Sequence, residues 1–166
     1  HLFLRDLQLN PDVELTLELS GECLEIRAVI AWDDAEEVGF KVRRSPGGEE
    51  ETLVRFNVNP GTRHGPPNEV RPLRELILDV SRSSTSPEVS NRESQRAVLE
   101  VPYGNSVELR IFVDRSVVEV IADRRHYVGK RIYPEHLDSV GVSAYARGGN
   151  ATLRSFDGWR MASIWP

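Results

Sequence analysis

The stretch Leu109-Arg110-Ile111-Phe112-Val113-Asp114-Arg115-Ser116-Val117-Val118-Glu119-Val120-Ile121-Ala122 decides the fold class. It contains two apolar runs separated by a short polar turn, which is the pattern of an antiparallel β-hairpin. With Arg115 and Ser116 as the turn, Asp114 faces Val117, and directly opposed residues share a face of the sheet. One face then carries only apolar side chains, which are Leu109, Ile111, Val113, Val118, Val120 and Ala122.

The other face of this hairpin is mixed. It carries Arg110, Phe112, Asp114, Val117, Glu119 and Ile121. Slipping the register by one residue would turn charges into the core, so the pairing is well specified. Phe112 and Ile121 are too apolar to stay fully exposed, and we expect a loop, another domain or a ligand to cover them.

Strand patterns recur along the chain, and helix patterns are nearly absent. Alternating or apolar runs predict strands at residues 13–19, 24–30, 38–43, 52–58, 76–80, 97–101, 127–133, 140–146 and 151–156. Turn motifs separate them, such as Ser45-Pro46-Gly47-Gly48 and Arg147-Gly148-Gly149-Asn150. We expect a single all-β domain over residues 1–166, with ten to twelve strands in a two-sheet antiparallel β-sandwich of the lectin-like or jelly-roll type.

Two polar stretches interrupt these strands. Asn59 to Pro72 contains four prolines and two glycines, which predicts a long irregular connection. Ser81 to Ser94 is polar and rich in serine. Loops of this length are usually functional or disordered, and both a functional loop and a mobile surface loop stay open for them.

Composition excludes several classes of function. The net charge of −5 argues against a nucleic-acid partner, and no apolar run is long enough to span a bilayer. The single cysteine, Cys23, excludes an intrachain disulfide. The segment from His1 to Arg5 lacks the features of a signal peptide, and a start at His1 suggests a fragment or a processed product. Extracellular and cytoplasmic locations both stay open.

Metal and nucleophilic chemistry have little support. His64, His126 and His136 are spread over predicted loops without paired spacing, so we predict no metal site and no cofactor. The serines lack a Gly-x-Ser-x-Gly context, and the glycines at 148 and 149 precede no helix that could hold a phosphate.

The hairpin resembles a signature of the C-terminal β-sandwich of glycoside hydrolase family 32, the invertase, inulinase and levanase family. Arg131-Ile132-Tyr133-Pro134, Asp138 to Ser143 and Ala151 to Trp159 extend the resemblance, which is strongest from about Asp79 to Trp165. Two departures are small. Ile121 stands where the family usually has Phe, and Asp123-Arg124-Arg125 replaces a common Asn-Gly turn.

The resemblance implies a parent enzyme that hydrolyses sucrose or fructans in a separate five-bladed β-propeller. The propeller's Asn-Asp-Pro and Arg-Asp-Pro motifs do not occur in this chain. Glu22-Cys23 matches the family's Glu-Cys acid/base motif. We reject it because it lies in a turn before an edge-like strand and has no nucleophile partner for a retaining mechanism. We therefore predict no catalytic residue, a propeller as the partner, and leave homo-oligomerisation open.

Sugar binding is the main alternative, since the fructan-binding family 66 carbohydrate-binding modules are related sandwiches. The candidate sugar-binding residues are Asp114, Arg115, Glu119 and Tyr145, with Tyr103, Tyr127, Tyr133 and Trp159 as further aromatic platforms. The competing interpretation is a cross-strand ion pair between Arg110 and Glu119, with the aromatics in the core or an interface. Three hypotheses remain: a structural module of a β-fructosidase, a stand-alone fructan- or fructose-binding module, and a complete small glycosidase. Asn150-Ala151-Thr152 is a formal glycosylation sequon.

Overall fold

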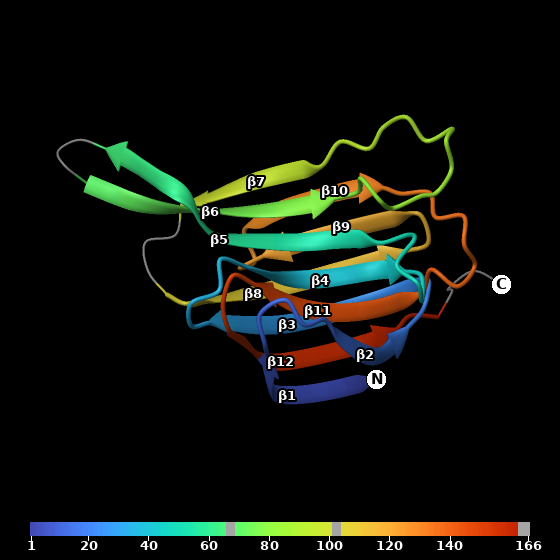
Figure 1. The fold of residues 1–166 in the computed structure, drawn as a ribbon, viewed down its shortest axis with the longest axis horizontal. Coiled ribbons are helices and arrows are strands. Elements are labelled where there is room, and N and C mark those ends of the chain that lie inside the picture. Colours follow the sequence, from blue (N-terminus) through green and yellow to red (C-terminus); the bar gives the residue numbers. More distant parts are fainter. Residues whose placement is uncertain (66–68, 101–103, 163–166) are drawn as a thin grey trace.

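A computed structural model describes residues 1–65, 69–100 and 104–162, and it is all-β over these ranges (Figure 1). Its twelve strands form two six-stranded antiparallel sheets that pack face to face, which confirms the predicted sandwich. The strands are β1 (Leu2–Leu9), β2 (Leu15–Ser20), β3 (Cys23–Trp32), β4 (Glu37–Arg44), β5 (Thr52–Gly65), β6 (Glu69–Asp79), β7 (Gln95–Glu100), β8 (Ser106–Asp114), β9 (Val117–Ala122), β10 (His126–Arg131), β11 (Gly141–Arg147) and β12 (Ala151–Arg160).

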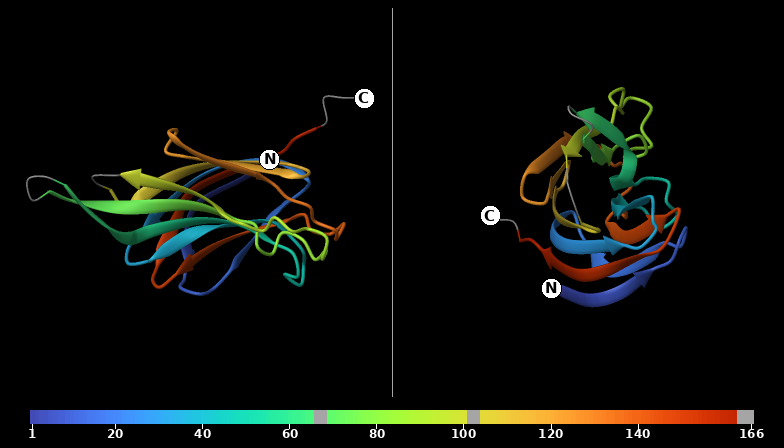
Figure 2. Two further views of the ribbon diagram at one scale, coloured as in Figure 1. Left: turned by 90° about the horizontal axis from the view of Figure 1, so that it is seen from above. Right: turned by 90° about the vertical axis from the view of Figure 1, so that its left-hand side faces the viewer.

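The two sheets have different strand orders. Sheet A runs β1-β12-β3-β8-β9-β10, and sheet B runs β2-β11-β4-β5-β6-β7. The chain therefore crosses repeatedly between the two layers, which Figure 2 shows from the side and from one end. Aromatic side chains from both sheets meet in the core. The ring of Phe40 in sheet B lies 5.9 Å from that of Phe156 in sheet A.

The β8–β9 hairpin has the predicted register. Leu109 pairs with Ala122, Ile111 with Val120 and Val113 with Val118. All six of these side chains are buried. Strict alternation with one apolar face was therefore enough to assign both the pairing and the core face.

The stretch from Asn59 to Pro72 is not the irregular connection that its prolines suggested. β5 continues to Gly65, and β6 returns from Glu69, with Gly61 paired to Leu73 and Thr62 to Pro72. Figures 1 and 2 show this two-stranded arm projecting beyond the sandwich. Each strand there has only one neighbour, so a proline without an N–H can face the unpaired side without losing a ladder bond.

The first strand, β1, was missed because its alternation changes phase. Leu2 and Leu4 pack against the core before Asp6, and Leu7 and Leu9 pack against it afterwards. Asp6 has a φ of 51°, which is the conformation of a bulge residue. The neighbouring strand β12 shifts its register against β3 between Leu153 and Ser155, so β1 and β12 stay paired through the irregularity.

The strand after Glu22 was expected to be edge-like, which is wrong. β3 lies inside sheet A between β12 and β8, and it is the best buried strand of that sheet. Its core side chains include Leu24, Ile26 and Ile30. The described ranges contain no helix that could cross a membrane.

Candidate functional site

Three of the four predicted sugar-binding residues lie on the β8–β9 hairpin, but they do not form one site. Asp114 is the last residue of β8, with Cys23 Sγ 3.5 Å from its Oδ1, and Arg115 lies in the turn with a φ of 51°. Glu119 lies further along β9 on the outer face of sheet A. It accepts a hydrogen bond of 2.7 Å from the hydroxyl of Tyr127. This bond raises the pKa of Tyr127.

The fourth residue, Tyr145, is on sheet B and is only 4% exposed. Its hydroxyl donates to Glu37 Oε1 at 3.0 Å, and Arg147 lies over its ring at 4.9 Å. Burial, followed by the nearby Glu37 carboxylate, raises the pKa of Tyr145 well above its usual value. Its ring faces Gly39 across the β4–β11 ladder, so it fills the space beside a glycine. This environment is that of a structural tyrosine, separate from the hairpin.

The expected ion pair between Arg110 and Glu119 is absent, because the register places Arg110 opposite Ile121. Arg110 binds Glu25 on β3 instead, with Nη2 at 2.6 Å from Oε1. Cationic or ring side chains also cover the aromatics of this face. Arg110 lies over Phe112 at 4.9 Å, and the ring of His1 stacks on Trp159 at 4.9 Å. The covering of Phe112 therefore comes partly from within its own strand.

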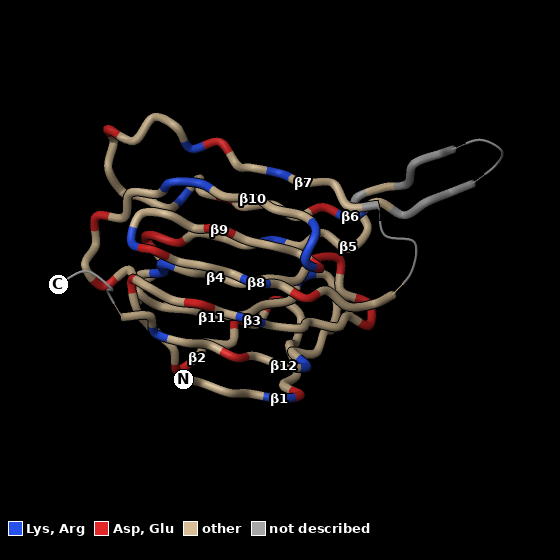
Figure 3. The backbone as a smooth tube through the Cα atoms, turned by 180° about the vertical axis from the view of Figure 1, so that it is seen from behind, with Lys and Arg blue, Asp and Glu red and all other residues tan. Residues whose placement is uncertain are grey.

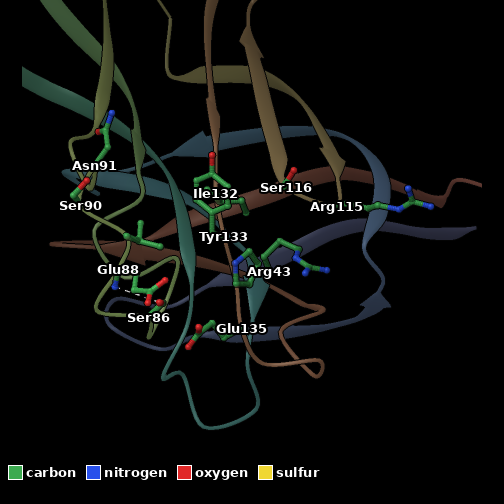
Figure 4. Close-up of a pocket in the computed structure, with 12 residues that line it drawn as sticks. Arg43, Ser86, Glu88, Ser90, Asn91, Arg115, Ser116, Ile132, Tyr133 and Glu135 are labelled. Atoms are coloured by element: carbon green, nitrogen blue, oxygen red, sulfur yellow. Dashed lines mark hydrogen bonds between the residues drawn. The ribbon is translucent and has the colours of Figure 1, made fainter.

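A cavity of about 680 Å³ opens at the end of the sandwich beside the Arg115–Ser116 turn. It is walled by residues 86 and 88–91 of the loop after β6, by residues 132–135 after β10, and by Arg43 near the end of β4 (Figure 4). It lies between the two sheets, since Arg43 comes from sheet B and the turn from sheet A. Tyr133, one of the predicted aromatic platforms, lines this cavity and is 51% exposed.

Glu50 forms hydrogen bonds to both of the loops that wall this cavity. Its fully buried carboxylate accepts bonds from the backbone N–H groups of Thr85 at 2.9 Å, Glu135 at 2.9 Å and His136 at 3.0 Å. The hydroxyl of Ser139 donates to it at 2.7 Å. Burial acts to raise the pKa of Glu50, but these donors prevail and lower it to about 2. A single ionised side chain thus joins the β4–β5 turn to both long loops.

Arg92 holds the loop of residues 81–94 from within. Its guanidinium donates to the carbonyls of Ser84 at 2.7 Å, Ser86 at 2.5 Å and Val89 at 3.0 Å. The polar stretch after β6 is therefore irregular, as predicted, and it is also internally hydrogen-bonded. The sequence left open whether this stretch is a functional loop or a mobile surface loop. This bonding favours an ordered loop that forms a wall of the cavity.

Arg43 is the most unusual residue of the cavity. It has a φ of 47°, and its side chain is only 6% exposed. Its Nε and Nη1 atoms are buried without a hydrogen-bond partner among the described residues, and Glu22 Oε1 lies 3.4 Å from Nη1. Sequence reasoning missed both Arg43 and Glu50. Glu50 lies in an acidic run, Glu49-Glu50-Glu51, where no local signal separates the buried member from its neighbours.

A second hollow of about 550 Å³ lies on the outer face of sheet A. Arg27 and Arg124 both pair with Glu108 there, at 3.2 and 3.0 Å, and these contacts lower the pKa of Glu108. Trp159 and Ile121 line the same hollow. Figure 3 shows basic and acidic residues intermingled over the strands, so this face is ion-paired rather than uniformly charged.

The remaining features from the sequence are metal binding, the Asn150 sequon and two aromatic residues. The described residues contain no group of three or more His, Cys, Asp or Glu side chains placed to hold a metal ion. Asn150 lies at the β11–β12 turn, where its backbone N–H donates to Asp34 Oδ1 at 2.6 Å. Tyr103 and Trp165 lie outside the described residues.

A comparison with protein families decides what kind of domain this is. The model described as "Glycosyl hydrolases family 32 C terminal" matches residues 5–160. The chain belongs to this family of C-terminal domains. The resemblance drawn from the hairpin is thereby confirmed, and the match extends through the N-terminal strands where the quoted motifs were weaker.

Relatives of this family 32 C-terminal domain are much longer than the chain. It is 32% identical over 151 residues to levanase from Bacillus subtilis, covering 88% of this chain and 20% of levanase. It is also 32% identical over 139 residues to the insoluble isoenzyme 1 of β-fructofuranosidase from Oryza sativa, covering 74% and 23% of the two chains. The chain thus spans about a fifth of the length of these relatives.

Solved structures support the fold of the family 32 C-terminal domain. Fructan 1-exohydrolase IIa from Cichorium intybus superposes with a TM-score of 0.83 at 15% identity, over 98% of this chain and 35% of that one. Exo-inulinase from Aspergillus awamori gives 0.74 at 21% identity, over 98% and 29%. These similarities extend over the whole sandwich.

Proposed function

We propose that this chain is the non-catalytic C-terminal β-sandwich of a β-fructosidase, and that it packs against a β-propeller catalytic domain and stabilises it. The observation that carries this proposal is the family match over residues 5–160 together with the small share of each relative that the chain spans. A module of this size accounts for one part of such enzymes. The remainder of each relative has room for a separate catalytic domain.

The chain's own carboxylates support a non-catalytic role. Glu22, the one residue with a family-like dipeptide, has a side chain that is 52% exposed and is paired with Arg43. Glu50, the best buried carboxylate among the residues whose burial is described, is held ionised by five donors from two loops. A retaining glycosidase needs one carboxyl group that stays protonated near neutral pH, which is the opposite of the environment of Glu50.

We assign the propeller contact to the outer face of sheet A. Phe112, Ile121 and Trp159 lie on this face, and Phe3 and Tyr127 are each 56% exposed. The ion pairs around Glu25 and Glu108 give it a polar character, which suits an interface between domains of one chain. Internal ion pairs occur on both outer faces, since Lys41 on sheet B lies between Glu14 at 2.8 Å and Glu51 at 2.9 Å. The aromatic side chains of sheet A therefore carry this assignment.

The test is association in trans. Levanase from Bacillus subtilis lacking the segment that this chain matches would be mixed with the purified chain and followed by sedimentation velocity. We expect a one-to-one complex and a higher melting temperature for the truncated enzyme. Arg110→Glu, on the outer face of sheet A, should weaken the complex at least about tenfold, because the reversal sets a second carboxylate beside Glu25 on the face assigned to the contact. Arg96→Glu, an exposed residue of sheet B, is the matched control and should leave it unchanged.

Two results would count against the proposal. The first is equal loss of association in both variants, which would remove the assignment to sheet A. The second is hydrolysis of sucrose by the purified chain alone, which would overturn the non-catalytic role. Self-association of the chain in the same sedimentation runs would report whether it forms homo-oligomers.

A further inference from the structure

The hollow on the outer face of sheet A combines an apolar lining with a cationic rim. Ile121 and Trp159 supply the apolar part, and both residues are half-buried. The same hollow is lined by three arginines, which are Arg27, Arg110 and Arg124. Its volume of about 550 Å³ lies within the range of pockets that hold small ligands, so it has room for a large side chain of another domain.

The ion pairs of this hollow place their positive members outermost. The side chains of Arg27, Arg110 and Arg124 are 52%, 51% and 76% exposed. Those of their partners Glu25 and Glu108 are only 19% and 23% exposed. Three guanidinium groups thus stand against two carboxylates, in a chain whose net charge is −5. A partner that approaches the hollow meets guanidinium groups first.

These guanidinium groups have more donors than their present bonds use. Each guanidinium carries five N–H donors. Arg27 donates from Nη2 to Glu108 at 3.2 Å, and Arg110 donates from Nε and Nη2 to Glu25 at 3.0 and 2.6 Å. The other N–H groups suit a second carboxylate, because the planar fork of arginine matches carboxylate geometry. An acidic partner would therefore add bonds here while the existing pairs stay in place.

The apolar lining narrows the class of partner further. A small inorganic anion would leave Ile121 and Trp159 uncovered. A purely apolar surface would remove three guanidinium groups from water without new bonds to them, which is costly. Tryptophan and arginine are the residues that most often dominate binding at protein interfaces. The hollow fits an apolar side chain with a carboxylate close to it.

We propose that this hollow receives an apolar side chain of the catalytic domain, flanked by an Asp or Glu that pairs with the rim arginines. The inference rests on the proposed contact between sheet A and the propeller, and it adds the chemistry of the partner surface at that contact. Because the added pairs lie at an accessible rim, salt should screen them and weaken the contact.

The first test probes the hollow in the purified chain alone. The dye 8-anilinonaphthalene-1-sulfonate joins apolar rings to an anionic group, and N-phenyl-1-naphthylamine has the same rings without the charge. We expect saturable fluorescence with the sulfonate and at least about tenfold weaker binding of the neutral dye. Trp159→Ala and Arg27→Gln should each weaken sulfonate binding roughly tenfold. Tyr133→Ala is the matched control, because it removes an exposed ring at the other cavity and should change nothing.

The second test uses the complex of this chain with truncated Bacillus subtilis levanase. The truncated enzyme should displace the sulfonate dye, and raising NaCl from about 50 to about 500 mM should weaken the complex at least about tenfold. Trp159→Ala and Arg27→Gln should weaken it by a similar factor. Val98→Ala, which shortens an exposed apolar side chain on sheet B, is the control and should not.

The outcomes separate this inference from the proposed function. A complex that forms but neither displaces the dye nor weakens in the two variants would overturn the inference and leave the proposed function standing. Equal binding of the two dyes, or sulfonate binding that survives both variants, would also overturn it. Dye binding as expected without any complex would count against the proposed function and would remove the catalytic domain as the occupant. Unfolding midpoints of all variants would exclude loss of structure as the cause.

Discussion

The two ends of the sandwich are built differently. At the end of the Asp123–Arg125 turn, β9 and β10 are joined by a three-residue connection, and β11 and β12 by the short turn of residues 148–150. At the end of the sandwich that carries the Arg115–Ser116 turn, residues 80–94 and 132–140 instead form long loops, and these loops enclose a cavity. Loops held on a rigid scaffold are where proteins place binding sites, and within the described residues the second end has such loops in a hydrogen-bonded arrangement.

The difference depends on one buried carboxylate. The Glu50 carboxylate accepts five hydrogen bonds from residues 85, 135, 136 and 139, all of which are distant from Glu50 in sequence. The short-turn end combines local bonds, such as the one from the N–H of Arg125 to the carbonyl of Ala122, with single backbone bonds between neighbouring turns, such as the one from the N–H of Glu36 to the carbonyl of Arg147. The loop end should therefore depend on Glu50 and Arg92, and the short-turn end should not.

The largest effect is expected for Glu50→Gln. The amide of the variant would place an N–H group against donors that now meet a carboxylate oxygen. In the wild-type chain the pKa of Glu50 is lowered from 4.5 to about 2, so losing the ionised form should destabilise the chain by about 3 kcal/mol. Urea unfolding followed by tryptophan fluorescence would measure this. Glu36→Gln, an exposed residue near the short-turn end, is the control and should change stability by less than about 0.5 kcal/mol. Equal effects in the two variants would refute the special role of Glu50.

The same carboxylate predicts the acid response. Because the pKa of Glu50 is lower in the folded chain than in the unfolded one, its stabilising contribution is fully present above pH 4.5 and is lost as the pH falls towards about 2. Unfolding free energies measured across this window should fall more steeply in the wild-type chain than in Glu50→Gln. Parallel curves would show that Glu50 is not ionised as described.

A smaller effect is expected for Arg92→Ala. Removing the guanidinium leaves the carbonyls of Ser84, Ser86 and Val89 without this donor, at a cost of about 1–3 kcal/mol. Limited proteolysis should then cut within residues 81–94. Arg96→Ala, which removes only a surface pair with Glu75, should stay resistant there. Cleavage at the same rate in both variants would show that Arg92 does not order the loop.

The smallest effect is expected for the two positive-φ arginines that lie in the turns at either end of β9, Arg115 and Arg124. Arg115→Gly should raise stability by about 0.5–1 kcal/mol, since glycine adopts a φ of 51° without strain. Arg124→Gly should gain less, because it also loses the pair with Glu108 at 3.0 Å. Thermal unfolding of the two variants side by side would rank them. A loss of stability in Arg115→Gly would mean that its guanidinium has a structural partner.

The sequence predicted the fold where local patterns carried the information. Alternation assigned the register of β8 and β9, and the polar composition of residues 81–94 marked a real loop. It failed where the structure broke a local rule. The bulge at Asp6 concealed β1, and the prolines of the β5–β6 arm are tolerated because each strand there has one free edge.

The candidate site was harder to predict for a related reason. Arg115 was recognised because it lies in the hairpin turn, but tertiary packing alone brings Arg43 to the cavity and Glu50 to the loops that wall it. Arg43 occurs in a run, Lys41-Val42-Arg43-Arg44, that is typical of an ordinary strand end. The positive φ of Arg43 arises where β4 and β11 shift register. A local sequence pattern does not predict such pairing between distant strands.

The central claim is that this chain serves as the C-terminal module of a family 32 enzyme. It is tested most directly by a chimera of Bacillus subtilis levanase in which the matched segment is replaced by this chain. Levan hydrolysis and the melting temperature would be measured for the chimera, for intact levanase and for levanase with that segment deleted. Recovery of activity and thermal stability in the chimera, well above the deleted form, is the predicted result. A chimera that aggregates or melts like the deleted form would contradict the claim.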